Sequence, residues 1–292
     1  MNAEAVTKGL GGRWSGHSGI ARCPAHEDRS PSLSIAKGRT GQLLLTCHAG
    51  CSFEDVLSAL RCRGLAGGRG PFAQTEIVRV EQRKEAERTH NLRRAKIARS
   101  IWRGSEPVGG TLAETYLRNR GISCPLPASL RYARECWHPA AKRLPALVGN
   151  VTGCDLDAVH RTYLRHDGTG KTEHFPSKAM LGATKGGAVR LSDSAGRLVV
   201  TEGIETGLSL LSGLMHGPLK VWAALSASGM KALHLRESPG DLVIAPDGDT
   251  AGRSAAQALA QRAYAVGWRV SLLSAPDGYD WNDVLTGKVK AP

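Results

Sequence analysis

Long apolar runs and aromatic side chains are what this 292-residue sequence has least of. Phenylalanine, tyrosine and tryptophan together make up 5% of it. No apolar stretch approaches the roughly 20 residues that a membrane-spanning helix requires. The first residues are polar and rich in glycine, unlike a secretory signal peptide with its apolar segment. These absences exclude a helical membrane protein and predict a cytoplasmic protein with a mainly aliphatic core and no membrane partner.

A complete disulfide framework is also absent, because the seven cysteines are an odd number. Without a secretory signal, the cysteines indicate a reducing compartment, where they serve as metal ligands or free thiols. Cys62, Cys124, Cys136 and Cys154 have no paired spacing, which is typical of buried thiols or of cysteines without a particular role. The remaining three lie in a short region rich in cysteine and histidine.

Acidic residues are fewer than basic ones, 26 against 39, so the formal net charge is +13. A positive excess of this size favours a polyanionic partner such as nucleic acid, although it also serves solubility. Part of the excess lies in residues 75–103, a segment without glycine or proline that predicts a basic helix. The basic side chains of this helix could form a solvated face or contact nucleic acid.

Two pairs of potential zinc ligands lie in the N-terminal region. Two residues separate Cys23 from His26, three separate Cys47 from Cys51, and twenty lie between the pairs. A predicted hairpin between the pairs would bring them together, as a tetrahedral zinc ribbon requires. Zinc would replace most of the core that so small a module lacks. His48 is an alternative ligand to Cys47, because its spacing to Cys51 is tighter.

Carboxylates follow two apolar runs in the C-terminal part of the chain. Glu202 ends one of these predicted strands, and Asp247 and Asp249 follow the other. Buried parallel strands that present acids beside the next helix can hold a hard cation, Mg²⁺ or Mn²⁺, against phosphate. Asp280 follows a later strand and would lie at a third acidic edge of the same crevice. A second cation about 3.5–4 Å from the first could activate an attacking hydroxyl.

Several basic residues between these regions could contact phosphate. Arg161, Tyr163 and Arg165 alternate along a predicted strand, so their side chains would share one face. Lys185 precedes two glycines that could cradle phosphate, and Arg190 follows five residues later. Each of these residues could equally belong to a solvated face.

Cys23-Pro-Ala-His-Glu-Asp-Arg-Ser-Pro-Ser-Leu-Ser34 followed by Cys47-His-Ala-Gly-Cys51 resembles the zinc ribbon of bacterial and phage DNA primases. The motifs around Glu202 and Asp247 are similar to the Toprim domain that follows the ribbon in those enzymes. Thr201-Glu-Gly-Ile-Glu-Thr206 and Asp280-Trp-Asn-Asp283 are most similar to the primases of phages, plasmids and integrated elements. The resemblance covers the zinc region and the C-terminal part well, and the middle only loosely.

The resemblance implies a role for each acid and for one lysine. It implies that Glu202 serves in metal binding or proton transfer. It implies that Asp247 and Asp249 bind metal ions, and that Asp280 assists them. It also implies that Lys178 and neighbouring arginines bind nucleotide and template.

Two positions depart from the family pattern. The primases have an acid four residues after the glutamate, where this sequence has Thr206, with Glu205 one position earlier. Asn282 replaces the second acid of the last motif, and Asp283 beside it could simply cap the following helix. Both departures concern the second metal site.

These expectations combine into a fold of four parts. We expect a zinc-ribbon domain in residues 1–65, a linker and basic helix in 66–105, the N-terminal part of a primase catalytic core in 106–196 and a Toprim domain in 197–292. The first parts are α+β, with a hairpin in the third. The last is α/β, since alternating strands and helices favour a parallel sheet with helices on both faces.

The predicted function is that of a DNA primase. It would synthesise short oligonucleotides from nucleoside triphosphates on a single-stranded DNA template, with Mg²⁺ or Mn²⁺ at the acids and Zn²⁺ in the ribbon. The sequence contains no nucleotide-binding P-loop, so a replicative helicase would be a separate protein. Two alternatives remain: a Toprim nuclease that uses the same acids to add water, and a non-catalytic module that binds or loads single-stranded DNA.

Overall fold

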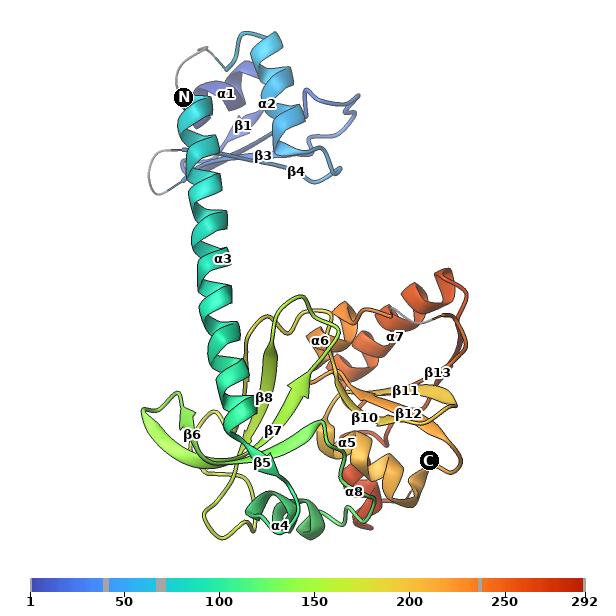
Figure 1. Cartoon of the computed structure of the whole chain (residues 1–292). Coiled ribbons are helices and arrows are strands. Elements are labelled where there is room, and N and C mark those ends of the chain that lie inside the picture. Colours follow the sequence, from blue (N-terminus) through green and yellow to red (C-terminus); the bar gives the residue numbers. More distant parts are fainter. Residues whose placement is uncertain (1, 39–41, 67–71, 236–237, 291–292) are drawn as a thin grey trace. The chain divides into compact units, whose positions relative to one another are not determined.

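The computed structural model describes residues 2–38, 42–66, 72–235 and 238–290. Contacts divide the chain into two compact units, Met1–Glu81 and Gln82–Pro292 (Figure 1). Each unit has a hydrophobic core of its own. None of the helices in the described ranges is long and apolar enough to cross a membrane.

A four-stranded antiparallel sheet in the order β1-β2-β3-β4 forms the N-terminal unit. Its elements are α1 (Ala3–Gly9), β1 (Arg13–Trp14), β2 (Ser18–Ala21), β3 (Leu33–Lys37), β4 (Leu43–Cys47) and α2 (Phe53–Cys62). Alternate residues of β3, Leu33 and Ile35, are buried against Val56 and Leu60 of α2. The core is small, as the sequence predicts for a module that needs a metal.

The predicted basic helix is present as α3 (Phe72–Gly104). Side chains of residues 82–90 are exposed, so the basic ones among them are accessible to solvent or to nucleic acid. Further along, Ala98 is buried with residues of a neighbouring sheet, and Arg99 pairs with Asp157. The C-terminal part of α3 therefore packs within the second unit.

The second unit begins with a five-stranded antiparallel sheet in the order β5-β6-β7-β8-β9. Its elements are β5 (Glu106–Pro107), α4 (Leu112–Asn119), β6 (Leu130–His138), β7 (Lys142–Val151), β8 (Ala158–Tyr163) and β9 (Lys178–Leu181). The β7–β8 pair is the predicted hairpin. Every residue of β8 is buried, because both faces of this strand are covered.

A second five-stranded sheet in the order β10-β12-β11-β13-β14 completes this unit. Its elements are β10 (Val189–Asp193), β11 (Arg197–Thr201), α5 (Ile204–Ser209), β12 (Leu219–Ala223), α6 (Ala227–Ala232), β13 (Asp241–Ala245), α7 (Thr250–Ala265), β14 (Arg269–Leu272) and α8 (Trp281–Leu285). The last four strands of the order are parallel, and β10 pairs antiparallel with β12. The predicted parallel sheet thus carries an antiparallel edge.

Helices cover both faces of this sheet, as predicted. Val199, Val221 and Val243 pack toward one face, with α4, α5 and α8. Val200 and Ile244 point to the other face, with α6 and α7. The alternation follows from the two-residue period of a strand and explains why the runs are apolar throughout.

One predicted helix is shorter and less regular than expected. The sequence favours a helix over residues 204–215, but α5 ends at Ser209 and continues as a wider turn, Leu210–Leu214. Gly213 has φ +118°, which ends the helical path. A glycine there tolerates a backbone conformation that other residues rarely adopt.

Candidate functional site

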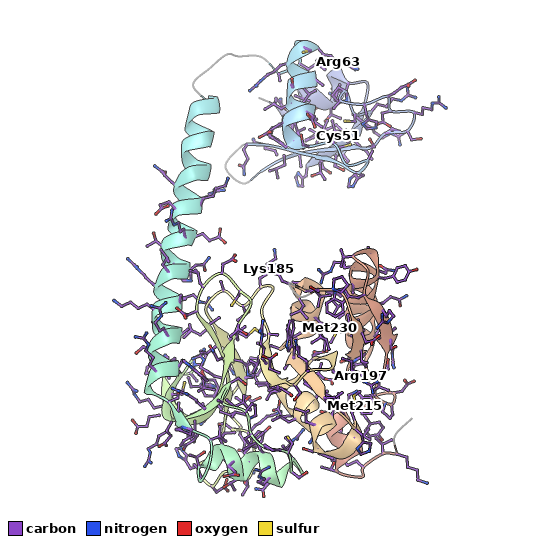
Figure 2. All side chains as sticks on the ribbon, turned by 45° about the vertical axis from the view of Figure 1, so that its right-hand side comes forward. Cys51, Arg63, Lys185, Arg197, Met215 and Met230 are labelled. Atoms are coloured by element: carbon purple, nitrogen blue, oxygen red, sulfur yellow. The ribbon has the colours of Figure 1, made fainter. Side chains whose placement is uncertain are left out.

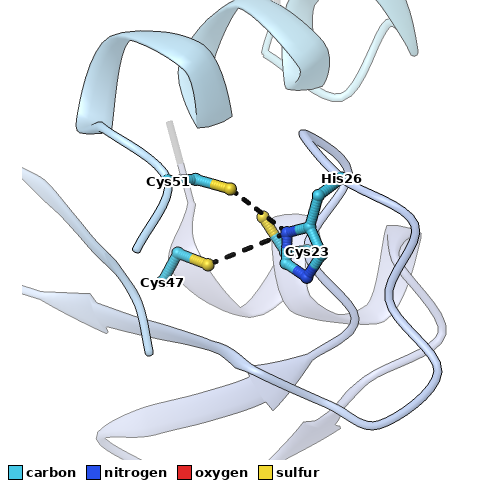
Figure 3. Close-up of side chains that lie close together, drawn as sticks. All are labelled: Cys23, His26, Cys47 and Cys51. Atoms are coloured by element: carbon cyan, nitrogen blue, oxygen red, sulfur yellow. Dashed lines mark hydrogen bonds between the residues drawn. The ribbon is translucent and has the colours of Figure 1, made fainter. Parts of the chain in front are cut away.

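Four potential zinc ligands meet at one end of the N-terminal sheet (Figure 3). The strand register aligns the end of β2, just before Cys23, with Cys47 at the end of β4. The ligand atoms of Cys23, His26, Cys47 and Cys51 all lie within 4.8 Å of one another. Ligands of a tetrahedral zinc ion lie roughly 3.5–3.8 Å apart. The chemistry and spacing of these side chains therefore fit zinc.

Asp28 holds the loop that carries the first ligand pair. Its Oδ2 accepts hydrogen bonds from the backbone N of Cys23 at 2.6 Å and the hydroxyl of Ser32 at 2.6 Å. His48 is exposed, and its Nε2 lies 2.8 Å from Oγ of Ser34. It is outside the cluster, so the structure favours Cys47 over His48 as the third ligand.

The second group of interest lies at the carboxyl ends of the parallel strands. Glu202 follows β11, and Asp247 follows β13 after Pro246. The two strands are neighbours, with Thr201 opposite Ala245, so these acids lie at the same edge of the sheet. Asp280 is the N-cap of α8, and Asp249 is the N-cap of α7.

Backbone hydrogen bonds join the turn at Asp247–Asp249 to the segment before Asp280. The backbone N of Gly248 donates to the carbonyl of Tyr279 at 2.8 Å, and the N of Gly278 donates to the carbonyl of Gly248 at 2.9 Å. A Cβ at position 248 would lie 1.9 Å from the carbonyl oxygen of Pro276. Only glycine lets these two acidic segments approach so closely.

The acids at this edge repel one another. Burial, together with the negative charges of Glu202 and Asp280, raises the pKa of Asp247 to about 7. Burial, with Asp249 nearby, also raises the pKa of Glu202, whose Oε2 is buried without a hydrogen-bond partner. A cation would neutralise this charge and satisfy this oxygen, so Glu202, Asp247 and Asp249 fit a divalent metal. Within the described ranges, only the cysteine–histidine cluster gathers three or more ligands around one point.

The departures from the family pattern have structural partners. Thr206, where the primases have an acid, donates its hydroxyl to Oδ1 of Asp247 at 3.1 Å. Asn282 is buried and donates to the carbonyl of Arg120 at 2.7 Å and to Oγ of Ser209 at 3.0 Å. Asp283 forms a capping box with Asp280. Asn282 and Asp283 therefore stabilise α8. For Asp283 this is the helix-capping role that the sequence allowed.

Glu205 is the centre of a buried ion-pair cluster beside the acids. Its carboxylate accepts a hydrogen bond from the hydroxyl of Tyr116 at 2.8 Å. Nζ of Lys178 lies 2.9 Å away, and Nζ of Lys171 lies 3.3 Å away. Glu205 is 4% exposed. It therefore acts as a counterion for two lysines and not as an open metal ligand.

The charges in this cluster stabilise one another. Burial alone would raise the pKa of Glu205, but Lys178 and Lys171 lower it well below its ordinary value. Burial would likewise lower the pKa of Lys178, but Glu205 raises it. For Lys171, burial prevails and its pKa is lowered. Lys178 also lowers the pKa of Glu202 and of Asp247, so its charge acts on these acids as well as on Glu205.

The other basic residues predicted to bind nucleotide or template are more scattered. Arg161 and Tyr163 share a face of β8 as their spacing predicts, but that face is covered and Arg161 is 6% exposed. Arg165 pairs with Glu173. Lys185 lies exposed in the turn between β9 and β10 (Figure 2), and the guanidinium of Arg190 lies 4.8 Å from the ring centre of Trp222.

Sequence reasoning missed two contributors to the site. Tyr116 comes from α4, 89 residues before Glu205, and no spacing connects them. Lys171 stands in the basic segment before β9 and resembles the lysines around it. Neither residue could be identified from the sequence alone, because their contacts with Glu205 arise only when the chain is folded.

Comparisons with known proteins agree with part of this picture. Residues 197–291 match the family model of the Toprim domain, and residues 92–191 match a family described as a domain of unknown function, DUF7146. No curated protein matches the sequence.

Among solved structures, the chain is similar to primases at low identity. The zinc-binding and RNA polymerase domains of the Aquifex aeolicus primase are 15% identical over 98% of this chain and 80% of that chain, with a TM-score of 0.42. The primase fragment of the bacteriophage T7 primase-helicase is 15% identical over 63% and 69%, with a TM-score of 0.37. The RNA polymerase domain of Mycobacterium tuberculosis primase DnaG is 16% identical over 68% and 79%, with a TM-score of 0.38.

The family model begins where β11 begins and includes Glu202, Asp247, Asp249 and Asp280. The same residues form the four parallel strands of the sheet, α5 to α8 and the acidic edge at the ends of the strands. Residues 197–291 of this chain are therefore a Toprim domain.

Proposed function

We propose that this chain is a DNA primase, a DNA-directed nucleotidyltransferase that makes short oligonucleotides on single-stranded DNA. The observation that carries the proposal is the acidic edge of the Toprim sheet with Lys178 beside it. Metal-binding acids next to a fixed cation suit a reaction at the phosphates of a nucleoside triphosphate. The cysteine–histidine cluster adds a zinc module of the kind that precedes Toprim domains in the primases that the sequence resembles.

Glu202, Asp247 and Asp249 would hold the divalent ions. When bound, Mg²⁺ or Mn²⁺ would shield phosphate charge and favour ionisation of the attacking hydroxyl. In the reaction, the 3′-oxygen of one nucleotide forms a bond to the α-phosphorus of the next, and the bond from that phosphorus to the β-phosphate oxygen breaks. Pyrophosphate leaves, and the hydroxyl proton passes to solvent or to a carboxylate at this edge.

Lys178 would neutralise phosphate charge during this exchange. Its Nζ lies 2.9 Å from Oε2 of Glu205, and its charge also lowers the pKa of Glu202 and of Asp247. A cation fixed before the substrate arrives does not need to reorganise in the transition state. Lys171, partly buried on the other oxygen of Glu205, would support the same position.

A primer-synthesis assay tests the proposal. Native protein, Asp247→Asn and Asp193→Asn would each receive single-stranded DNA, labelled nucleotides and Mg²⁺. Asp193 lies on β10 with a side chain that is 70% exposed, which makes it a matched control on the same sheet. We expect template-dependent product from the native chain and from Asp193→Asn. Asp247→Asn should lose activity by on the order of 100-fold or more, since metal contacts contribute several kcal/mol.

Absence of template-dependent product across several templates, with ribonucleotides and deoxynucleotides alike, would contradict the proposal. Degradation of DNA without nucleotides, abolished in Asp247→Asn, would instead support the nuclease alternative. Salt-sensitive binding that survives Asp247→Asn, with no product from the native chain, would support a non-catalytic module.

A further inference from the structure

One face of α3 carries basic side chains that have no acidic partner. Arg93, Lys96 and Arg103 are exposed, and Ser100 is exposed between them. An α-helix turns by about 100° per residue, so positions 93, 96, 100 and 103 fall within roughly 80° of one another around its axis. We refer to these four residues as the basic stripe.

The other side of the same helix segment is packed against the antiparallel sheet. Ala98 is buried with residues of β6, β7 and β8, and Ile101 and Trp102 pack against this cluster. Nη1 of Arg131 on β6 donates to the carbonyl oxygen of Trp102 at 3.1 Å. These packed side chains and the basic stripe are centred about half a turn apart. The basic stripe therefore faces away from the sheet, on a helix that the sheet holds in place.

The basic stripe has no counterion in the described ranges. Three acids near the helix pair with basic residues outside the stripe: Glu85 with Arg88 at 3.9 Å, Asp157 with Arg99 at 2.6 Å, and Glu106 with Arg134 at 3.9 Å. Glu87, the other acid of this segment, projects from the opposite side of the helix. Arg93, Lys96 and Arg103 make no ion pair with any described carboxylate. Three positive charges on this face are thus left for a partner.

The basic stripe is separate from the cation beside the acidic edge. Tyr163 of β8 belongs to the cluster that contains Ala98, so its side chain is on the α3 side of the sheet. Thr162, the preceding residue, points to the other face and stands opposite Lys178 in the β8–β9 register. On that face, Nζ of Lys178 lies 2.9 Å from Glu205. The stripe is therefore a second cationic surface, on the far side of this sheet.

A row of unpaired cations on a fixed helix suits a regular polyanion. From position 93 to position 103 the basic stripe is about 15 Å long. A row of this length lies beside about four phosphates of one strand of a DNA duplex. Arginine, lysine and hydroxyl side chains supply most contacts to the backbone of nucleic acids. The net charge of +13 on the whole chain favours the same kind of partner.

A lipid surface fits the basic stripe less well. Helices that lie on membranes insert a continuous apolar face. The apolar face of α3 is packed against the sheet around Ala98. Leu92 and Ile97 are the exposed large apolar side chains among the described ones of α3, and they lie on opposite sides of the stripe. They do not form an apolar face of their own.

We propose that the basic stripe of α3 binds the phosphodiester backbone of a nucleic acid. Contacts of this kind do not depend on base sequence and weaken as salt is added. Taking DNA as the nucleic acid rests on the proposed function, in which the stripe would hold DNA outside the site at the acids. Single strands and duplexes present the same phosphate chemistry, so both are offered in the test.

The test is binding of fluorescein-labelled DNA to the full-length protein, measured by anisotropy at several salt concentrations without nucleotides. The two probes are an oligothymidylate and a duplex of the same length. The stripe variant combines Arg93→Ala, Lys96→Ala and Arg103→Ala. A charge-keeping variant combines Arg93→Lys, Lys96→Arg and Arg103→Lys.

The matched control removes the same charge from the same helix outside the basic stripe. It combines Arg83→Ala, Lys84→Ala and Arg88→Ala, three exposed positions on other faces of α3. Alanine is a strong helix former, so both alanine variants keep the helix. Thermal unfolding checks that every variant is folded.

We expect the stripe variant to bind about 10- to 100-fold more weakly at about 0.1 M salt, with the slope of log affinity against log salt shallower by about two. The control and the charge-keeping variant should remain near native in both quantities. A loss with one probe alone assigns the stripe to that form of DNA. Native affinity in the stripe variant, an equal loss in the control, or no DNA binding by the native chain would overturn the inference.

Vesicles of anionic phospholipid form a second arm of the test. We expect the native chain and the stripe variant to bind them equally weakly. Vesicle binding that only the stripe variant loses, with its affinity for DNA unchanged, would overturn the inference in favour of a lipid surface.

The same measurement on Asp247→Asn separates this inference from the proposed function. That variant keeps the basic stripe and should bind both DNA probes as tightly as the native chain does. If native protein binds DNA through the stripe but makes no primer, the proposed function fails and the stripe stands. If it makes primer and the stripe variant binds DNA like the native chain, the stripe fails alone.

Discussion

Asp247 and Glu202 lie close together in a partly buried site, and the positive charge of Lys178 offsets their repulsion only in part. A carboxyl in the unfolded chain ionises near pH 3.8, but Asp247 in the folded chain does so near pH 7. The unfolded state therefore loses its proton first, and this residue reduces stability progressively as the pH rises from about 3.8 to about 7. The acids to which we assign metal binding therefore weaken the fold when no cation is bound.

Asp247→Asn should therefore stabilise the metal-free protein while it removes activity. At pH 8, without added magnesium, we expect the free energy of unfolding to rise by roughly 1–4 kcal/mol, and by less at pH 5. Urea unfolding of the second unit at the two pH values measures this. Asp193→Asn is the control and should change little. Equal effects at both pH values, or destabilisation by Asp247→Asn, would show that the ionised Asp247 carboxylate does not destabilise the folded state.

Glu205 presents the opposite case, since its charge is fully compensated. Glu205→Gln would leave Lys178 and Lys171 without their counterion. Because both lysine side chains are partly exposed, we expect a loss of about 1–3 kcal/mol in the free energy of unfolding. Adding Lys178→Met should recover part of the loss, because it removes an unpaired charge. The folded pKa is lowered, so the contribution of Glu205 is present above about pH 4.5 and is lost as the pH falls through the lowered value.

Urea unfolding of the single and double variants measures this coupling as a double-mutant cycle. Glu173→Gln is the control, because its partner Arg165 is exposed and such pairs contribute little. Additive effects of Glu205→Gln and Lys178→Met would contradict the ion-pair cluster.

At the scale of elements, the turn around Gly248 determines whether the acids meet. Gly248→Ala keeps every acid but places a Cβ 1.9 Å from the carbonyl of Pro276, so the turn must move. We expect primer synthesis to fall as it does in Asp247→Asn, with a stability loss of about 1–3 kcal/mol. Gly240→Ala is the control. Gly240 precedes β13, the strand that leads to Gly248, and a Cβ added there has no atom within 4 Å. Native activity in Gly248→Ala would contradict this account of the turn.

Elements that are determined by a local sequence pattern were predictable from the sequence. The apolar runs that became β11 and β13 end in acids, and this pattern alone located Glu202 and Asp247. The antiparallel pairing of β10 with β12 was not predictable, because it depends on tertiary contacts and not on residues 189–193 alone.

Contacts between side chains that are far apart in the sequence were not predictable either. Alternation along β8 correctly put Arg161 and Tyr163 on one face, but it could not tell that this face is covered. Glu205 stood one position from the expected acid, and only its contacts with Tyr116 and Lys178 reveal its role.

At the scale of the whole chain, the two units differ in what stabilises them. The N-terminal unit has a small core and four potential zinc ligands, whereas the second unit has several hydrophobic clusters. Native protein should contain about one tightly bound zinc ion per chain. A chelator should abolish the thermal transition of the N-terminal unit and leave that of the second unit.

Calorimetry with and without chelator, together with the zinc content, tests this. Cys23→Ser should lose the metal and the first transition. Cys62→Ser, which changes an exposed thiol outside the cluster, should keep both. Native protein purified without zinc, or equal loss in the two variants, would contradict a structural zinc site.

The contact between Tyr116 and Glu205 has a consequence for how this chain can evolve. Tyr116 belongs to the segment that matches one family, and Glu205 to the segment that matches the other. The same two segments also share one hydrophobic core. A Toprim segment transplanted onto a foreign neighbour would carry a buried carboxylate without Tyr116, Lys171 and Lys178, its partners. The two segments are therefore not interchangeable modules, and we expect recombination to pass them on as a single inherited block.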